Sequence, residues 1–282
     1  MKTYSKTAAV DEESTRVSCP VCRGTVFKNL WQVESSIFVR CADCRLILQN
    51  PQPVRTALAA RYDEEYFRYE IENEESFYNL MMLGLNDVGF FENIAPALPQ
   101  PNRILDIGCA TGRLLHHFKQ AGWETAGAEL CRESVEYGNK TYDVNIRPSP
   151  LETAGFPDHH FSVVHASHLI EHVDDPGTFV TEVMRVLLPG GVFLCVTPSS
   201  DGLQAKIFGS SWRSVIPDHV TLFDRKTLRR LLETAGFSVL AVRTWGGLAV
   251  GTVPAWLKKP VDRLAKKWGF GDVVLMAARK TS

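Results

Sequence analysis

The chain has no long hydrophobic segment and no excess of charge of either sign. No apolar run approaches the roughly 20 residues that a helix needs to cross a bilayer, and the polar stretch Met1–Ser18 lacks the apolar core of a signal peptide. A formal net charge of −1 gives no general attraction to nucleic acid or to a membrane. With 45% hydrophobic and 22% charged residues among 282, we expect a cytoplasmic globular protein with one large domain and one small one.

Four of the seven cysteines form two closely spaced pairs. Cys19 and Cys22 make one C-x2-C pair, and Cys41 and Cys44 make the other. This spacing is typical of zinc sites, because each pair offers two thiolates and four thiolates close a tetrahedral coordination shell. We therefore expect a structural zinc ribbon with a hairpin over 26–39, in which the metal replaces a hydrophobic core. Two disulfides are the alternative.

The most informative stretch is residues 103–115, RILDIGCATGRLL. A short apolar run leads into Gly108 and Gly112, and a helical pattern follows, which is how α/β folds approach nucleotide-like ligands. Asp106 ends this expected strand, and Glu129 ends the next one, where an acid accepts hydrogen bonds from ribose hydroxyls. The three-glycine pattern G-x-G-x-x-G is absent, which disfavours an NAD-dependent enzyme.

These residues resemble the class I S-adenosylmethionine-dependent methyltransferases. Leu105–Gly112 is similar to their first motif, with Ala110 in place of a glycine, and Glu129 is similar to their second. Further similar segments are Phe161–Ser167, Arg185–Pro198, Asp218–Phe223 and Leu228–Phe237. The resemblance covers about residues 100–280. It implies a Rossmann-like α/β fold, a doubly wound and mostly parallel sheet of seven strands, with the seventh strand antiparallel between the fifth and sixth.

The alternation of strand-like and helix-like segments also predicts a parallel sheet. We expect strands near 103–107, 123–128, 143–147, 161–166, 191–197, 237–243 and 272–280, and helices near 112–121, 132–141, 175–188 and 225–235. The chain would divide into a disordered tail (1–17), a zinc-binding ribbon (18–48), a helical linker that caps the substrate (49–99) and the catalytic domain (100–282).

The resemblance implies S-adenosylmethionine as the cofactor. The glycine loop and Asp106 would meet its methionine part, Glu129 its ribose, and Leu130 one face of its adenine. Pro150 stands where similar proteins place an acid for the adenine amine, so either Glu152 substitutes or backbone or water reads that edge. The predicted cofactor-binding residues are Asp106, Gly108, Cys109, Ala110, Thr111, Gly112, Glu129, Leu130, Leu151, Glu152 and Ser167.

The family places acceptor-side groups after the fourth strand, where this chain reads HLIEH from His168 to His172. Methyl transfer is an in-line displacement from a sulfonium, and a hydroxyl acceptor must also lose a proton. Because imidazole titrates near neutral pH, His172, His219 or His168, with Glu171 beside them, is a candidate base or anchor. Alternatives are a divalent ion at His168, Glu171 and His172, as in similar quinone O-methyltransferases, and a structural role.

A subset of bacterial methyltransferases that act on sugars and glycans resembles this layout, with a four-cysteine module followed by an N-P-x-P … Y … Y-F segment. The predicted substrate-binding residues are Tyr62, Tyr66 and Phe67 of that segment, together with Trp212 and Arg213. Arg213 suits a phosphate or carboxylate. Residues 254–268 are basic and amphipathic, with Pro260 expected in the first turn of a helix; they could touch a lipid surface or pack on the domain.

We therefore expect O-methylation of a small-molecule, glycan-type or lipid-linked acceptor, with a histidine base. One alternative is a nucleic-acid or protein methyltransferase that reads its substrate with the ribbon. No N/D-P-P-Y/F tetrad follows the fourth strand, which argues against a nucleic-acid substrate. The other alternative is a non-catalytic interaction protein, which the intact Asp106, Gly108, Gly112 and Glu129 disfavour.

Overall fold

A computed structural model of the protein describes residues 14–53, 64–247 and 255–281. Tyr62 and most of the predicted N-terminal tail lie outside these residues. Within the covered ranges, no helix combines the length and hydropathy that crossing a membrane requires.

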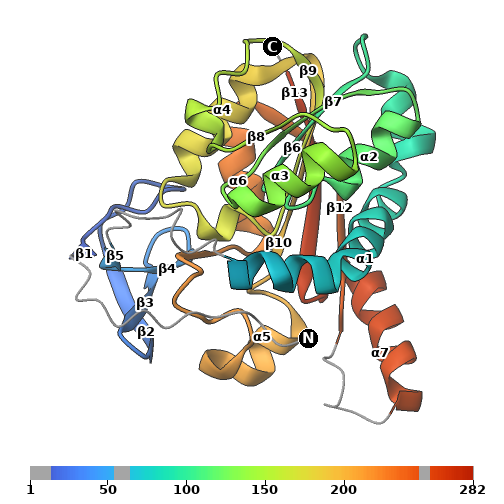
Figure 1. The fold of residues 1–282 in the computed structure, drawn as a ribbon. Coiled ribbons are helices and arrows are strands. Elements are labelled where there is room, and N and C mark those ends of the chain that lie inside the picture. Colours follow the sequence, from blue (N-terminus) through green and yellow to red (C-terminus); the bar gives the residue numbers. More distant parts are fainter. Residues whose placement is uncertain (1–13, 54–63, 248–254, 282) are drawn as a thin grey trace.

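A seven-stranded sheet forms the centre of the molecule, with helices on both of its faces (Figure 1). Its strands are β6 (Arg103–Ile107), β7 (Glu124–Ala128), β8 (Ile146–Arg147), β9 (Phe161–Ser167), β10 (Leu187–Pro198), β12 (Phe237–Trp245) and β13 (Val273–Lys280). The strand order is β12-β13-β10-β9-β6-β7-β8. The strands from β10 to β8 pair in parallel, whereas β13 is antiparallel to both β10 and β12. The predicted sheet and the place of its antiparallel strand are confirmed.

Alternation along the strands sends neighbouring residues to opposite cores. On β6, Leu105 and Ile107 join a core covered by α4 (Pro176–Val186) and α6 (Arg225–Thr234). Ile104 joins the other core, which is covered by α2 (Arg113–Gln120), α3 (Arg132–Thr141) and the end of α1 (Glu64–Asp87). By this alternation Asp106, near the carboxyl end of the strand, lies on the same face as Ile104, the side of α1.

Shorter elements complete the chain. A π-helical turn (Phe90–Ile94) and a 3-10 turn (Ala95–Ala97) follow α1, so the predicted cap region is helical from α1 onward. Other short elements are 3-10 turns at Leu151–Thr153, Ile170–His172 and Gly209–Ser211 and the helix α5 (Leu203–Phe208).

The helix α7 (Ala255–Trp268) contains Pro260 in its interior rather than in its first turn, which corrects our expectation. A proline at the sixth helical position cannot donate to the carbonyl four residues earlier. Near the other end of the helix, Leu264 and Trp268 are exposed, whereas Ala265 is buried.

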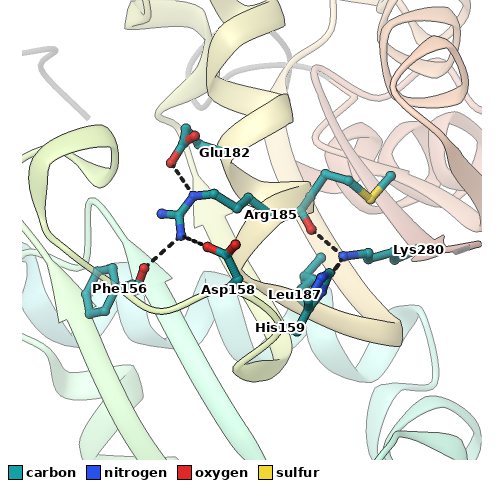
Figure 2. Close-up of polar contacts among 8 residues, drawn as sticks. Phe156, Asp158, His159, Glu182, Arg185, Leu187 and Lys280 are labelled. Atoms are coloured by element: carbon teal, nitrogen blue, oxygen red, sulfur yellow. Dashed lines mark hydrogen bonds and ion pairs between the residues drawn. The ribbon is translucent and has the colours of Figure 1, made fainter.

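The Arg185–Pro198 motif has a structural role at the end of α4 (Figure 2). Arg185 donates to the carbonyl of Phe156 at 2.8 Å and to Oε2 of Glu182 at 2.9 Å, and it also pairs with Asp158. The buried Lys280 of β13 donates to the carbonyls of Met184 and Leu187, at 2.7 and 2.9 Å. A cation is favourable at a helix C-terminus, so these two residues fix the passage from α4 into β10.

The N-terminal segment forms a second sheet, drawn in blue at one side of the main domain (Figure 1). It contains β2 (Phe27–Val33), β3 (Ser36–Cys41) and β4 (Ile47–Gln49), and β2 and β3 are the predicted hairpin. The outer strand of this sheet, β11 (Thr221–Leu222), comes from the large domain and pairs antiparallel with β4. A separate two-stranded pair joins β1 (Ser14–Thr15) to β5 (Gln52–Pro53).

The ribbon also shares hydrophobic cores with the large domain. Phe38 and Ile47 pack with Trp212 and Leu222. Leu48 joins the main core on the α4 face. From the sequence we expected the metal to replace a hydrophobic core in the ribbon. In the structure the ribbon also packs apolar side chains against the large domain.

Candidate cofactor and acceptor site

Asp106, the penultimate residue of β6, is a buried carboxylate with one hydrogen-bonded oxygen. Its Oδ1 accepts a hydrogen bond from Nδ1 of His165 at 2.7 Å. These residues are register partners on adjacent parallel strands, and His165 was not in the predicted set. Oδ2 of Asp106 is buried without a hydrogen-bond partner among the residues that the structure covers. A buried carboxylate oxygen at the ligand-binding edge of a sheet suits a donor or cation of the ligand.

The loop after Asp106 adopts left-handed backbone at three positions. Gly108, Ala110 and Gly112 have φ values of 67°, 48° and 76°. A Cβ on Gly112 would lie 2.7 Å from Cδ1 of Ile146, so the glycine is needed for conformation and for space. Ala110 keeps the conformation of a glycine despite its methyl group.

Cys109 belongs to the loop by its backbone and to the core by its side chain. It is buried in the core on the α1 face, and a Cβ on Gly127 would lie 2.6 Å from its Sγ. The predicted cofactor contact of Cys109 is therefore restricted to its main chain.

Glu129 connects the end of β7 to the glycine loop. One carboxylate oxygen accepts from the backbone N–H of Ala110 at 3.0 Å, and the other accepts from Leu130 and Cys131 at 2.7 and 2.8 Å. Burial raises the pKa of the Glu129 carboxyl, although these amide donors oppose the effect. A carboxylate has about four lone-pair positions, so it can still accept a ribose hydroxyl.

The helix α1 is fastened to the same loop through Glu74, which sequence analysis missed. Glu74 accepts from the Thr111 hydroxyl at 2.6 Å and the Tyr142 hydroxyl at 2.7 Å, and it forms an ion pair with Arg113 at 3.3 Å. The predicted residue Thr111 is therefore bonded to α1 through its side chain. The acidic residues repeated along α1 could have indicated a helix face that makes polar contacts. Their partners could not be predicted, because they lie in distant segments of the chain.

Glu70 lies one helical turn before the half-buried Glu74 and is itself buried. Burial raises its pKa to about 7, with a hydrogen bond from Tyr66 acting against the shift and the charges of Glu129 and Glu74 adding to it. The predicted residue Phe67 packs its ring 5.8 Å from that of Tyr137 on α3. The first turns of α1 thus lie near the end of β7.

The predicted adenine-side residues separate in the structure. Leu151 is buried in the main core, so the structure places it behind the site rather than on its surface. Glu152 is exposed. Leu130, two residues after β7, and Ser167, the last residue of β9, are half-buried.

Glu171 is a buried carboxylate in the turn after β9. Its Oε2 accepts from the Thr197 hydroxyl at 2.8 Å, and Nδ1 of the exposed His168 lies 3.3 Å from Oε1, an ion-pair distance without hydrogen-bond geometry. Burial opposes ionisation of Glu171, but His168 outweighs it, so the pKa of this carboxyl lies below its usual value.

Two histidines meet beside Glu171. Nδ1 of His172 lies 3.0 Å from the carbonyl of Asp218, and Nδ1 of His219 lies 2.9 Å from the carbonyl of Ser214. Because a carbonyl only accepts, both Nδ1 atoms carry a proton, and in the neutral form of each ring Nε2 is the acceptor. The rings are 4.6 Å apart and nearly perpendicular. Burial, and then His172, lower the pKa of His219 to about 3, which keeps it neutral at physiological pH.

One coordinating atom each from Glu171, His172 and His219 lies within 4.8 Å of the others. The possible cation site therefore uses His219, whereas sequence analysis named His168 for that set. One carboxylate and two imidazoles this close together suit either a proton donor, such as a hydroxyl group, or a metal ion.

Trp212 and Arg213 both bond to Asp272, just before β13. The Trp212 indole, 1% exposed, donates to Oδ1 at 2.6 Å, so the structure places this residue in the interior and not at a substrate surface. Arg213 donates from Nε to Oδ2 at 2.6 Å and keeps its side chain 42% exposed. Burial raises the pKa of Tyr69 on α1; the charge of Glu70 adds to the shift and the charge of Arg213 opposes it. Arg213 is thus close enough to this part of α1 for its charge to act on Tyr69.

The four cysteines of the ribbon come together as free thiols. Sγ of Cys19 lies 3.4 Å from that of Cys44, and Sγ of Cys22 lies 3.5 Å from that of Cys41. All four sulfurs lie within 4.8 Å of one another. Tetrahedral Zn²⁺ with Zn–S bonds of about 2.3 Å needs sulfurs roughly 3.8 Å apart, so this cluster fits that ion.

The strand order and the loop between Asp106 and Glu129 define the class I S-adenosylmethionine-dependent methyltransferase fold. Residues 88–242 match the model of a family described as a methyltransferase domain, and the chain belongs to that family.

Similar proteins fit this assignment. The chain is 34% identical over 152 residues to a "Probable S-adenosylmethionine-dependent methyltransferase" of Mycolicibacterium smegmatis, covering 52% of this chain and 57% of that protein. It is 28% identical over 131 residues to a ubiquinone biosynthesis O-methyltransferase of Cereibacter sphaeroides, covering 44% and 53%. The chain thus spans about half the length of these curated relatives. A methyltransferase structure from Archaeoglobus fulgidus shares the fold, with a TM-score of 0.55 over 77% of this chain and 100% of that one, at 21% identity.

Proposed function

We propose that the protein transfers a methyl group from S-adenosylmethionine to a hydroxyl group of a small-molecule or glycan-type acceptor. One observation carries the cofactor assignment: Asp106 and Glu129 lie at the carboxyl ends of adjacent parallel strands, beside a left-handed loop, and Oδ2 of Asp106 is buried without a partner among the described residues. The cofactor supplies a methyl group on a positively charged sulfonium, which two buried acids favour.

His172 is the proposed general base. Its Nδ1–H is fixed on the carbonyl of Asp218, so Nε2 takes the hydroxyl proton while the hydroxyl oxygen bonds to the methyl carbon and the carbon–sulfur bond breaks. Glu171, ionised beside it, stabilises the imidazolium that results. His219 is a weak base because its pKa is about 3, but its neutral Nε2 can accept a hydrogen bond and orient the acceptor.

We also propose that Cys19, Cys22, Cys41 and Cys44 hold a structural zinc ion. Elemental analysis should find one zinc per chain. Cys44→Ser should lose it, whereas Cys131→Ser, which changes a cysteine outside the ribbon, should keep it. Shared strands and cores make the ribbon part of the fold, which favours a small acceptor over a nucleic acid or protein read by a projecting module. The relative named as an O-methyltransferase supports oxygen as the attacked atom.

The decisive experiment combines binding with turnover. Calorimetry should detect binding of S-adenosylhomocysteine but not of NAD or RNA. Absence of S-adenosylhomocysteine binding would reject the proposal. Transfer of labelled methyl is then measured to phenols, catechols, sugars, RNA and protein, with and without added Mg²⁺, in protein whose zinc content is measured alongside. Turnover of a hydroxyl acceptor without added cation, in protein that holds one zinc per chain, supports the histidine base. A strict need for a further cation assigns Glu171, His172 and His219 to metal binding instead.

A further inference from the structure

The last residue of β4 joins the ribbon to the loop that carries His219. Gln49 is 1% exposed, and its side-chain amide donates to the carbonyls of Pro217 at 2.8 Å and His219 at 3.0 Å. Its backbone N–H donates to the carbonyl of Val220 at 2.8 Å, just before β11. One ribbon residue therefore binds three of four consecutive carbonyls on the acceptor side.

The fourth carbonyl of that run orients the proposed base. It belongs to Asp218, lies between the two carbonyls that the Gln49 amide binds, and accepts from Nδ1 of His172 at 3.0 Å. His219 bonds to Ser214 through its own Nδ1. Fixing the peptides on both sides of Asp218 thus fixes which nitrogen of His172 is protonated and which faces the acceptor.

The four-cysteine cluster in turn fixes Gln49. Cys41 ends β3, and the turn from Cys41 to Leu46 is closed by a 2.9 Å hydrogen bond from the Cys41 N–H to the Leu46 carbonyl. The strand β4 begins at the next residue and pairs with β3 on one side and β11 on the other. Gln49 lies five residues after Cys44 in this ladder, so the position of its amide depends on the turn that holds two of the cysteines.

We propose that Gln49 is a positioning residue that transmits the order of the four-cysteine site to His172 and His219, and that it serves the acceptor side without serving cofactor binding. The catalytic meaning of this assignment rests on the proposed function, but the positioning can be measured without turnover. Glutamine suits the role because its Nε2 carries two hydrogens for two carbonyls. An ionised glutamate would set carboxylate oxygens against carbonyls, and leucine would leave two buried carbonyls without donors.

The test uses the full chain labelled with ¹⁵N-histidine, in which long-range proton–nitrogen spectra report the tautomer of each ring. Asparagine substitutions at His172 and His219 assign their signals. In the wild type we expect the Nδ1–H tautomer for both rings. Gln49→Leu should lose this single tautomer at His172 and bind S-adenosylhomocysteine with wild-type affinity. Gln52→Leu is the matched control, because Gln52 is also a buried glutamine, 5% exposed, in the separate β1–β5 pair; it should leave both rings unchanged.

Zinc removal by a chelator gives a second, independent measurement on the unsubstituted chain. The tautomer of His172 should be lost, and S-adenosylhomocysteine binding should remain. Unchanged tautomers in Gln49→Leu, or in the chelated protein, would overturn the proposal. Loss of S-adenosylhomocysteine binding in either would also overturn it, since the ribbon would then support the whole fold. A wild type that binds no S-adenosylhomocysteine refutes the proposed function instead, and leaves the tautomer result to be judged separately.

Discussion

The cofactor side and the acceptor side of this molecule are built in different ways. On the cofactor side, Asp106, the loop to Gly112 and Glu129 lie within one strand–helix–strand unit and are held largely by backbone groups. On the acceptor side, the turn at Glu171 and His172 meets the loop ending at His219, and Gln49 holds that loop from the ribbon. A local unit can be recognised from the sequence, whereas a site assembled from three distant segments depends on contacts that no local pattern records.

The largest effect is expected from a substitution that disrupts the cofactor side alone. Gly108→Val places a β-branched residue at a φ of 67°, with its Cβ 3.3 Å from Cδ1 of Leu169. We expect calorimetry to show no S-adenosylhomocysteine binding, while zinc content stays at the wild-type value. Gly190→Val is the matched control, because Gly190 has a φ of 78° and a Cβ added there would have no atom within 4 Å. Wild-type affinity in Gly108→Val would refute the loop assignment.

The next largest effect is expected from a substitution that disrupts the acceptor side alone. His172→Asn removes the proposed base and should lower kcat by about 10²- to 10⁴-fold, with S-adenosylhomocysteine affinity unchanged. His168→Asn changes the exposed neighbour of Glu171 and should have the smaller effect. Equal losses in the two variants would show that the proton does not go to His172.

A smaller effect tests the acid on α1 beside the cofactor side. The folded-state pKa of Glu70 is raised to about 7, so the protonated form is favoured on folding and its stabilisation is lost as pH rises through about 7. Glu70→Gln keeps the neutral form. We expect it to be more stable than the wild type at pH 8 by about 2 to 3 kcal/mol in urea unfolding, and to lose this advantage at pH 4. The exposed Glu152→Gln should show no such pH dependence.

The smallest expected effect concerns Ala110, the alanine in the glycine loop. Its φ of 48° is in the left-handed region, where a side chain costs about 1 kcal/mol. Ala110→Gly relieves this strain but adds chain entropy to the unfolded state, so we expect a gain in unfolding free energy below about 1 kcal/mol. Thermal unfolding measures it. A loss of stability would mean that the methyl group makes favourable contacts in the loop.

Much of the sheet was predictable because its signals are local. The strand over 103–107 and the helix over 132–141 have the predicted bounds, since apolar alternation and helical spacing decide them without distant partners. The helix predicted over 175–188 ends at Val186, because Leu187 pairs with Phe161 of β9 and so begins β10 before the Pro-Gly-Gly turn. Pairing with a strand far away in sequence overrode the local stop signal.

Within the site, the sequence indicated several of the residues that come together but not the contacts that surround them. Glu171, His172 and His219 do come together, although Gln49, which binds the loop ending at His219, gave no local signal. Trp212 was expected to contact the substrate because it lies just before the loop of His219 in the sequence. Its indole N–H finds the buried Asp272, sixty residues later, which made the interior its favourable place.

The position of β13 has a consequence for how the protein is made. This strand lies between β10 and β12 and also follows Asp272, the partner of Trp212 and Arg213. Synthesis runs from the N-terminus, so β10 is complete long before its antiparallel neighbour leaves the ribosome. Until then, β10 has an open, apolar edge of the kind that other unfinished chains can join. The cofactor loop is therefore synthesised well before β13 can complete the sheet.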